Sequence, residues 1–338
     1  MTRPDGRIVD DISAAVGNTP LVRLSRLFPH TQVLAKVESV NPGGSAKDRP
    51  AAAMLDAALA TGELAPGGTV VESSSGNLGL ALARSCTVRG ITFVCVVDSR
   101  ANTTTVAAIK ALGGKIELVM EPDPETGDLL TARIKRVQQL LQEIPGAVNL
   151  YQYGNPANPG SHRDGTMREI AEATDHQLDA VVAACSTTGT ISGCAAYIRE
   201  HGMKTKVIAV DAVGSVLFGG TAGPRNLPGM GAGFVTDLSR TVTPDQVLRV
   251  GERDCVAGAR ALARTEGILA GASTGAVVHA VARLLTEHPG LQRVAMLVHD
   301  GGLPYMNTVY DDDWVAQHLG VSPESMERSV QELTEANA

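Results

Sequence analysis

The stretch Asn41-Pro42-Gly43-Gly44-Ser45-Ala46-Lys47-Asp48-Arg49-Pro50 is the most informative part of the chain. A proline and two glycines predict a tight turn, and the residues after Pro50 favour a helix with Asp48 as its N-cap. Lys47 is therefore expected at the positive end of a helix, where its pKa is lowered. A lysine that is partly neutral can attack an aldehyde and form a Schiff base. The alternative is a surface lysine beside a helix cap, a common place for lysines.

Composition restricts the class of protein. The chain has 338 residues, of which 43% are hydrophobic and 19% charged, enough for two domains with full cores. Its net charge is −7, and no run of lysine or arginine stands out. We therefore expect neither a nucleic-acid-binding protein nor a protein of the membrane surface.

Targeting and redox signals point to a cytoplasmic protein. Residues 1–11 are polar and acidic, unlike a signal peptide, and no apolar run approaches the ~18 residues of a membrane span. The five cysteines are scattered, and no two of them form a C-x-x-C pair. They are interpreted as thiols in a reducing compartment, with no metal site.

Strand-like and helix-like segments alternate along the chain. Residues 91–97 and 180–184 are almost wholly apolar, which is typical of strands covered on both faces. This alternation predicts an α/β protein with two open, mostly parallel twisted sheets flanked by helices. The predicted helices are 77–89, 102–112, 128–143, 160–173, 190–201, 253–267, 274–287 and 312–319, besides the one after Lys47.

The expected domain organisation has a boundary near residue 150. Residues 1–45 are expected to be a segment that packs on the larger domain, and residues 46–150 a smaller α/β domain. Residues 151–320 are expected to form the larger α/β domain, and residues 321–338 a polar tail that frays as a helix. The stretch 214–244 is rich in glycine and proline and too long for a plain connection, which favours a functional loop.

Two loops lie where a strand passes into a helix, at the edge of the sheet where ligands bind in such folds. The first is Ser73-Ser74-Ser75-Gly76-Asn77, whose hydroxyls and N–H groups suit a carboxylate. The alternative is an ordinary N-cap with a glycine turn.

The second loop is Ser186-Thr187-Thr188-Gly189-Thr190, which offers hydroxyls and N–H groups enough to surround a phosphate without a lysine. The Walker A and Rossmann G-x-G-x-x-G patterns are absent here, so NAD is not expected. The alternative is a helix cap rich in serine and threonine.

The pattern Asn-Pro-x-x-Ser-x-Lys-Asp-Arg resembles the lysine motif of the cysteine synthase and cystathionine β-synthase family. The resemblance covers the chain from Val16 to about Trp314. It implies the fold-type II architecture, similar to the tryptophan synthase β subunit, a homodimer, and pyridoxal 5'-phosphate as cofactor.

The resemblance also assigns roles to individual residues. It implies that Lys47 holds the cofactor aldehyde, that Asn77 contacts its 3'-oxygen, and that Ser273 in Gly271-Ala272-Ser273-Thr274-Gly275 bonds its ring nitrogen. The loop of Ser186, Thr187, Thr188, Gly189 and Thr190 would hold its phosphate. Ser74, Ser75 and Gln152 would bind the substrate carboxylate. Tyr153 and Arg133 are further candidates for substrate contact, and Gly229 to Gly233 resembles a segment that closes over substrate.

Departures from the family pattern concern the substrate. Leu78 stands where the family has a threonine, which removes an expected hydroxyl contact with the substrate, and Ser186 and Thr188 stand where it has two glycines, which narrows the site. The lysine motif, the Ser-Thr-Thr-Gly loop, Val210-Asp211-Ala212-Val213-Gly214-Ser215-Val216 and Leu227-Pro228-Gly229-Met230-Gly231-Ala232 together resemble N-(2-amino-2-carboxyethyl)-L-glutamate synthases. Those enzymes join O-phospho-L-serine to L-glutamate on the way to 2,3-diaminopropionate, a precursor of siderophores and peptide antibiotics.

Two other functions are weighed. A cysteine synthase using sulfide is the main alternative, and a cofactor-binding regulator without activity is less consistent with Lys47, Asn77 and Ser273 together. A cystathionine β-synthase with a regulatory module is not expected, because no long domain follows Gly320.

Overall fold

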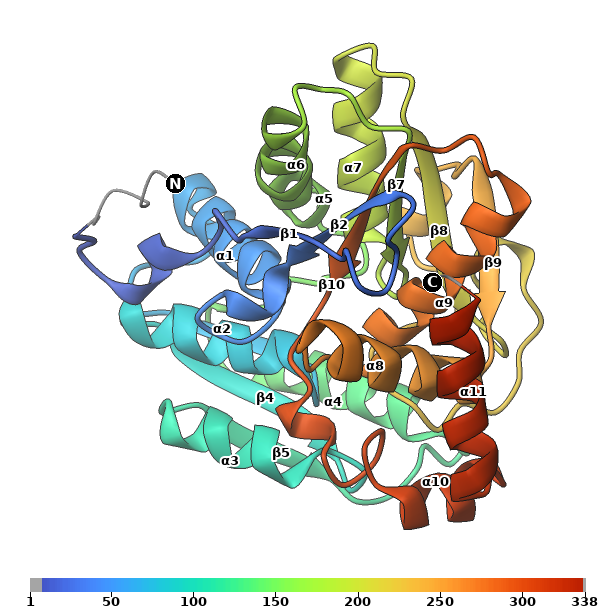
Figure 1. The fold of residues 1–338 in the computed structure, drawn as a ribbon. Helices are drawn as coiled ribbons and strands as arrows, with labels where there is room; N and C mark the ends of the chain where they lie inside the picture. Colours follow the sequence, from blue (N-terminus) through green and yellow to red (C-terminus); the bar gives the residue numbers. More distant parts are fainter. Residues whose placement is uncertain (1–7, 337–338) are drawn as a thin grey trace. The chain divides into compact units, whose positions relative to one another are not determined.

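The computed structural model describes residues 8–336, which fall into two compact units. Unit 1 contains the described residues up to Gly17 together with Asn41–Leu150, and unit 2 contains Asn18–Val40 and the chain from Tyr151 onward (Figure 1). The segment expected over residues 1–45 is therefore divided between the units, because residues 32–37 pair with residues 293–298 near the end of the chain, and residues 21–23 pair with residues 34–36.

Unit 1 is built on a four-stranded parallel sheet in the order β5-β4-β3-β6. Its strands are β3 (Thr69–Ser73), β4 (Thr92–Asp98), β5 (Lys115–Val119) and β6 (Ala147–Val148). Its helices are the short 3-10 helix η1 (Ile12–Ala15) and α1 (Asp48–Thr61), α2 (Asn77–Val88), α3 (Thr103–Ala111) and α4 (Leu129–Glu143).

The neighbours of β4 show that helices cover both faces of this sheet. Val94 and Val96 pack with Val137 and Leu140 of α4 on one face. On the other face, a side chain at Gly79 of α2 would meet the Cys95 sulfur, so the helix lies close against the strand. The apolar run that predicted this strand therefore reflects helices on both sides.

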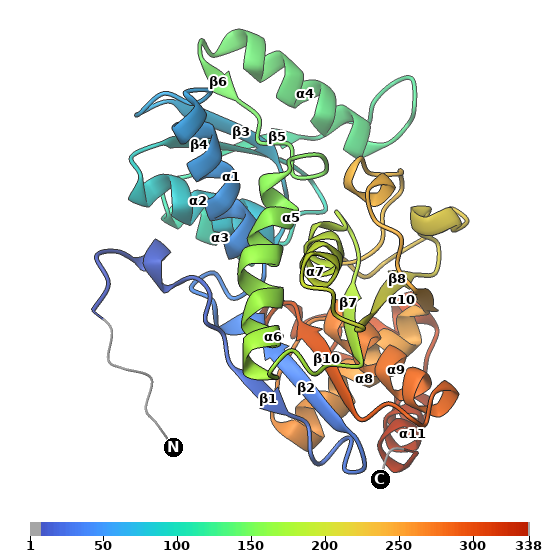
Figure 2. The ribbon, with the colours of Figure 1, turned by 90° about the horizontal axis from the view of Figure 1, so that it is seen from above.

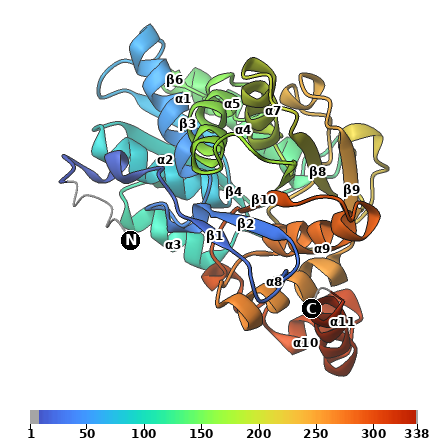
Figure 3. The ribbon, with the colours of Figure 1, turned by 45° about the horizontal axis from the view of Figure 1, so that its top comes forward.

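Unit 2 is built on a six-stranded sheet in the order β1-β2-β10-β7-β8-β9, parallel except for the edge strand β1. Its strands are β1 (Leu21–Arg23), β2 (Gln32–Val37), β7 (Ala180–Ala184), β8 (Lys206–Ala212), β9 (Gln246–Val250) and β10 (Arg293–Val298). Figure 3 shows β2, from the start of the chain, beside β10, from its end.

The helices of unit 2 cover both faces of this sheet. They are α5 (Ala157–Ser161), η3 (His162–Met167), α6 (Arg168–Ala173), α7 (Gly189–Glu200), α8 (Glu252–Glu266), α9 (Ala272–Glu287), α10 (Asp312–Leu319) and α11 (Pro323–Glu335). The short 3-10 helices of this unit are η2 (Glu38–Val40), η4 (Leu217–Gly219), η5 (Leu238–Arg240) and η6 (Leu303–Tyr305). Alternate residues of β7 belong to different clusters, since Ala180 and Val182 pack with α8 and α9 and Val181 packs with α6 and α7.

Several elements differ from the sequence expectations, among them the two-residue strand β6, which was not predicted. The helix expected at residues 160–173 begins at Ala157. Its three segments α5, η3 and α6 follow one another as a single rod, and the middle segment, η3, has π-helical geometry (Figure 2). Strand β9 was not predicted. The expected polar tail contains α11, a helix that buries Met326, Val330 and Leu333 against the core of unit 2.

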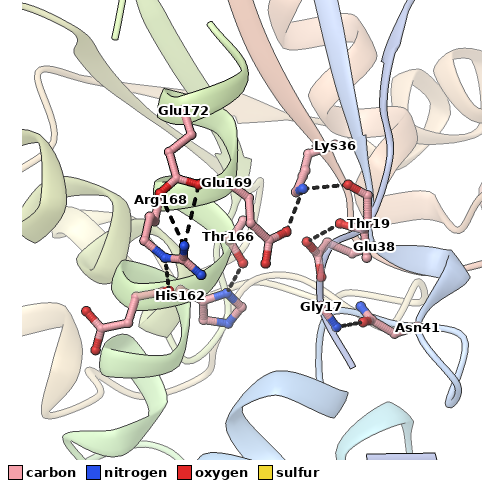
Figure 4. Close-up of polar contacts among 11 residues, drawn as sticks. Gly17, Thr19, Lys36, Glu38, Asn41, His162, Thr166, Arg168, Glu169 and Glu172 are labelled. Carbon is pink, nitrogen blue, oxygen red and sulfur yellow. Dashed lines mark hydrogen bonds and ion pairs between the residues drawn. The ribbon is translucent and has the colours of Figure 1, made fainter. Parts of the chain in front are cut away.

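A buried ion pair fixes the start of unit 2. The Lys36 ammonium, on β2, lies 2.7 Å from a Glu169 carboxylate oxygen on α6 and donates to the Thr19 carbonyl at 2.6 Å (Figure 4). The Thr19 hydroxyl donates to Glu38, which is fully buried. Because the Lys36 side chain is only 3% exposed, these contacts compensate for its removal from water.

Candidate active site

The Lys47 turn of unit 1 is held by its own side chains. The Lys47 N–H donates to the Ser45 hydroxyl at 3.2 Å, and the Gly43 N–H donates to Asp48 at 2.8 Å. Lys47, not Asp48, occupies the N-cap position of α1, because Asp48 is already the first helical residue and its carboxylate turns back to the loop. The expectation that Asp48 is the N-cap is thus wrong by one residue, while Lys47 does lie at the amino end of the helix.

Asp48 is the buried support of this turn. Burial raises the pKa of its carboxyl, opposed by the Arg84 guanidinium 3.3 Å away and by the N–H groups of the loop. A Cβ atom at position 43 would lie 2.3 Å from an Asp48 oxygen, so a larger residue there would displace the Asp48 carboxylate. The glycine in front of Lys47 therefore serves packing as well as the turn.

The Ser73–Asn77 loop of unit 1 joins β3 to α2. Ser74 is buried, and its hydroxyl accepts the Gly79 N–H at 3.0 Å, so this side chain caps the helix. Ser75 and Asn77 are partly exposed. Ser74 thus has a structural role at the place where the sequence predicted a substrate contact.

Arg133 lies on α4 of unit 1, and its guanidinium nitrogen Nε is 3.2 Å from Asp98, the last residue of β4. Strands β3 and β4 are parallel neighbours, so Arg133 lies at the same sheet edge as the Ser73–Asn77 loop. The side chain is 13% exposed, unlike the solvated arginines common on helices.

The Ser186–Thr190 loop of unit 2 joins β7 to α7, whose first residue is Gly189. Thr187, Thr188 and Thr190 are buried, and Ser186 is partly exposed. Thr188 has a left-handed φ of 67°, a strained conformation for a β-branched residue. Its hydroxyl donates to the Thr187 carbonyl at 2.6 Å, so this side chain stabilises the turn.

Two residues that the sequence analysis did not single out support this loop. His162 Nε2 lies 3.3 Å from the Thr190 hydroxyl, and its Nδ1 lies 3.0 Å from the hydroxyl of Thr166. Asn158 donates to the Gln152 carbonyl at 2.8 Å and to the Thr187 hydroxyl at 3.3 Å. Neither residue has a local pattern that marks it, because both act through residues distant in sequence.

Ser273 of unit 2 is buried in the first turn of α9. Gly229, with φ of 98°, passes close to it, and a Cβ atom added there would lie 3.7 Å from the Ser273 hydroxyl. The glycine segment is anchored by the Gly231 N–H, which donates to the Cys185 carbonyl at 2.6 Å. The segment that the sequence associated with closure therefore lies against Ser273 within unit 2.

Gln152 and Tyr153 lie directly after Tyr151, the residue at which the chain enters unit 2 for the second time. Gln152 is buried. The Tyr153 ring contacts Phe234 edge to face, with ring centroids 5.0 Å apart, and its carbonyl accepts the Leu238 N–H at 3.0 Å. Tyr153 thus packs beside the chain that continues from the glycine segment.

A family model described as "Pyridoxal-phosphate dependent enzyme" matches residues 12–300. The chain belongs to this family. It is therefore a pyridoxal-phosphate-dependent enzyme, and its similarity to synthases of this family makes it a β-replacement synthase.

Three relatives refine the comparison. An N-(2-amino-2-carboxyethyl)-L-glutamate synthase of Ralstonia nicotianae is 45% identical over 312 residues, which are 92% of each chain. The crystal structure of O-ureido-L-serine synthase has a TM-score of 0.82 at 33% identity and covers 92% of this chain and 100% of its own. The O-acetylserine-dependent cystathionine β-synthase of Helicobacter pylori has a TM-score of 0.83 at 27% identity, covering 89% and 98%.

The residues of this family member fit the phosphate end of the cofactor. In unit 2, three buried threonines surround the first turn of α7, whose N–H groups lack acceptors within the helix. Such a site suits a phosphate anion, and the loop contains no carboxylate that would repel it.

Thiol chemistry does not fit the five buried cysteines of this enzyme. Burial raises the pKa of both Cys86 and Cys95 to about 12, which keeps these thiols protonated at neutral pH. Burial also raises the pKa of Cys255 strongly. We found no cluster of metal-ligating side chains within residues 8–336, and none of the helices there is long and apolar enough to span a membrane.

Proposed function

We propose that this enzyme joins O-phospho-L-serine to L-glutamate, forming N-(2-amino-2-carboxyethyl)-L-glutamate and phosphate. The observation that carries the proposal is the 45% identity to such a synthase over 92% of both chains. The departures at Leu78, Ser186 and Thr188 support it, because they alter the loops expected to contact substrate.

The proposal gives the cofactor residues the following roles. Lys47 would hold the aldehyde of pyridoxal phosphate and would also accept the Cα proton of the substrate as general base. Asn77 and Ser273 hold the ring, and Ser186 to Thr190 hold the phosphate. Bound pyridoxal phosphate supplies the electron sink that makes the Cα proton removable, and a neutral serine at the ring nitrogen limits that sink, which favours β-replacement over transamination.

The acceptor amine sets a further requirement. Near neutral pH an amine is mostly protonated and is then a poor nucleophile, so the site must orient glutamate and accept its proton. Arg133, Tyr153 and Ser186 are the donors proposed for the phosphate and carboxylates of the two substrates, with Ser75 and Gln152 at the carboxylate of phosphoserine. Ser74 supports this carboxylate site through the cap of α2.

The wider setting is also proposed. We infer a cytoplasmic homodimer whose product leads to 2,3-diaminopropionate, for a siderophore or a peptide antibiotic. The second candidate function is cysteine synthesis with sulfide, which the likeness to an O-acetylserine-dependent enzyme keeps open.

The test combines the purified holoenzyme with O-phosphoserine and either glutamate or sulfide, and identifies products by mass spectrometry. Glutamate should give a product heavier than cysteine, and O-acetylserine should be a much poorer donor. Arg133→Ala should lower turnover with glutamate, whereas Arg136→Ala, on the same helix but paired with Glu117 and Glu143, should leave it unchanged. Efficient cysteine formation without reaction of glutamate would show that the protein is a cysteine synthase.

A further inference from the structure

We propose that Asn158 is a positioning residue that makes the Thr187 hydroxyl a hydrogen-bond donor toward the cofactor phosphate. The inference rests on the proposed role of the Ser186–Thr190 loop in holding that phosphate. It concerns contacts within unit 2 alone and identifies a residue whose own side chain need not touch the ligand.

The orientation of the Asn158 amide is determined by its partner. Asn158 is 2% exposed, and its Nδ2 lies 2.8 Å from the backbone carbonyl of Gln152. A carbonyl can only accept, so the donor end of the amide must face it. The same Nδ2 group lies 3.3 Å from the Thr187 hydroxyl and therefore donates to it as well.

Thr187 receives a second donor from its own loop. The Gly189 N–H donates to the Thr187 hydroxyl oxygen at 3.2 Å. A hydroxyl has two acceptor lone pairs and one proton, and both lone pairs are now occupied. The proton is left to point away from Asn158 and Gly189, and the hydroxyl can contribute further only as a donor.

The surrounding contacts keep this arrangement in place. The Thr187 carbonyl accepts from the hydroxyls of Thr188 at 2.6 Å and Thr236 at 3.4 Å. A Cβ atom at position 189 would lie 2.0 Å from Asn158 Oδ1, so the amide packs directly against the loop. A side chain at position 189 would displace the amide from this place.

A donor fixed in advance matters at a phosphate site. Hydrogen bonds to an ionised acceptor are stronger than neutral ones, and a preoriented donor needs no reorganisation when the anion arrives. Asn158 also holds the backbone of Gln152, the proposed substrate-carboxylate residue. Loss of Asn158 should thus weaken cofactor binding first and raise the Michaelis constant for phosphoserine as well.

The test measures equilibrium dissociation of pyridoxal phosphate and the ³¹P shift of the bound cofactor. Asn158→Asp presents an acceptor to Thr187, so the Thr187 hydroxyl should donate to residue 158 and no longer to the phosphate. The affinity for pyridoxal phosphate should then fall about tenfold, the loss of one charge-assisted hydrogen bond. Thr187→Val should cause a similar loss, and Thr187→Ser should restore binding. The double variant should be no weaker than either single variant, because both remove the same donor.

Asn149→Asp is the matched control, since Asn149 also donates to a backbone carbonyl, that of Val71, and both residues belong to unit 1. It should leave the ³¹P shift and the affinity unchanged. Asn158→Ala replaces the aspartate variant if that variant does not fold, as judged by circular dichroism. Additive losses in the double variant, or wild-type affinity of both Asn158 variants, would overturn the proposal.

These measurements need no substrate, so they are independent of whether glutamate is the acceptor. If Thr187→Val and Thr187→Ser both bind the cofactor as the wild type does, the phosphate does not lie at this loop. That result would reject the proposed cofactor site itself. Additive losses of affinity in the double variant would reject only the role of Asn158.

Discussion

Lys47 combines a sequence motif with a defined place in the structure. Its N–H is held by Ser45, its carbonyl accepts the first hydrogen bond of α1 from Ala51 at 3.0 Å, and its side chain is partly exposed. By contrast, Lys36 is buried in the ion pair with Glu169. A lysine that exchanges with substrate must be accessible, as Lys47 is and Lys36 is not.

We predict that borohydride reduction of the yellow holoenzyme attaches the cofactor to the peptide that contains Lys47. Lys47→Ala should abolish this labelling, because no other lysine sits at the turn, whereas Lys110→Ala, on the exposed face of α3, should leave it unchanged. Peptide mass spectrometry gives the position. Labelling of Lys36 or Lys110 in the wild type would contradict the assignment.

Asp211 gives a prediction about pH. It is fully buried on β8, and burial raises the pKa of its carboxyl, opposed by the Ser215 hydroxyl and the Ala212 N–H. As pH rises, the Asp211 carboxyl loses its proton at a lower pH in the unfolded chain than in the folded chain. The contribution of Asp211 to the unfolding free energy therefore falls as pH rises above about 4. Asp211→Asn should become progressively more stable relative to the wild type over that range.

The comparison uses urea unfolding at several pH values between about 3 and 8, a range that extends below the unfolded pKa of an aspartate. Asp123→Asn is the opposite control, because a hydrogen bond from Lys135 lowers the pKa of Asp123. Its carboxylate stabilises the fold above the unfolded pKa of about 4 and loses that effect as pH falls below it. The wild type should therefore gain stability over Asp123→Asn as pH rises, and trends of the same sign would contradict the argument.

At the scale of elements, α8 and α9 place Ser273 by an unusually close approach. A Cβ atom at Gly258 would lie 2.1 Å from the Gly275 carbonyl oxygen, and one at Gly275 would lie 1.9 Å from that of Cys255. The contacts are to backbone, which cannot rotate away as a side chain can. The position of the first turn of α9 therefore depends on two glycines.

We predict that Gly258→Ala lowers the unfolding free energy by about 2–3 kcal/mol, because the helices must separate. Gly160→Ala in α5 is the control, since no atom lies within 4 Å of a Cβ added there, and alanine is the better helix former. Denaturant unfolding measures both variants. Equal stability of the two variants would show that the helices can shift without cost.

At the scale of the whole molecule, residues far apart in the chain complete the core of unit 2. Strand β2 lies beside β10, and α11 places Met326 against α8 (Figure 1). The surface of α11 forms exposed pairs such as Arg264–Glu327, which add little stability. The buried face of this helix is what holds the end of the chain.

We predict that Met326→Ala costs about 2–5 kcal/mol of unfolding free energy, as for other fully buried methionines. Arg328→Ala, two residues away and exposed, should change it by less than about 0.5 kcal/mol. Thermal and urea unfolding give both values. A small effect of Met326→Ala would support the expectation of a frayed tail.

Much of the local structure was predictable because its causes are local. The apolar run at Ala180–Ala184 predicted β7 with its observed bounds, and the short helix expected at residues 312–319 is α10. The lysine turn and the two serine-rich loops were recognisable since turn and cap chemistry depend on neighbouring residues. These features, with the family resemblance, were sufficient to predict the cofactor and the reaction class.

The tertiary structure alone decided what depends on distant partners. Strand order, the membership of residues 18–40 in unit 2 and the burial of α11 arise from pairing and packing between segments that are separated in the sequence. Asn158 and His162 gained their roles in the same way, since a lone asparagine or histidine carries no periodic signal. Hydrogen bonds of this kind are set by which surfaces pack together, and sequence periodicity records only which side of an element is buried.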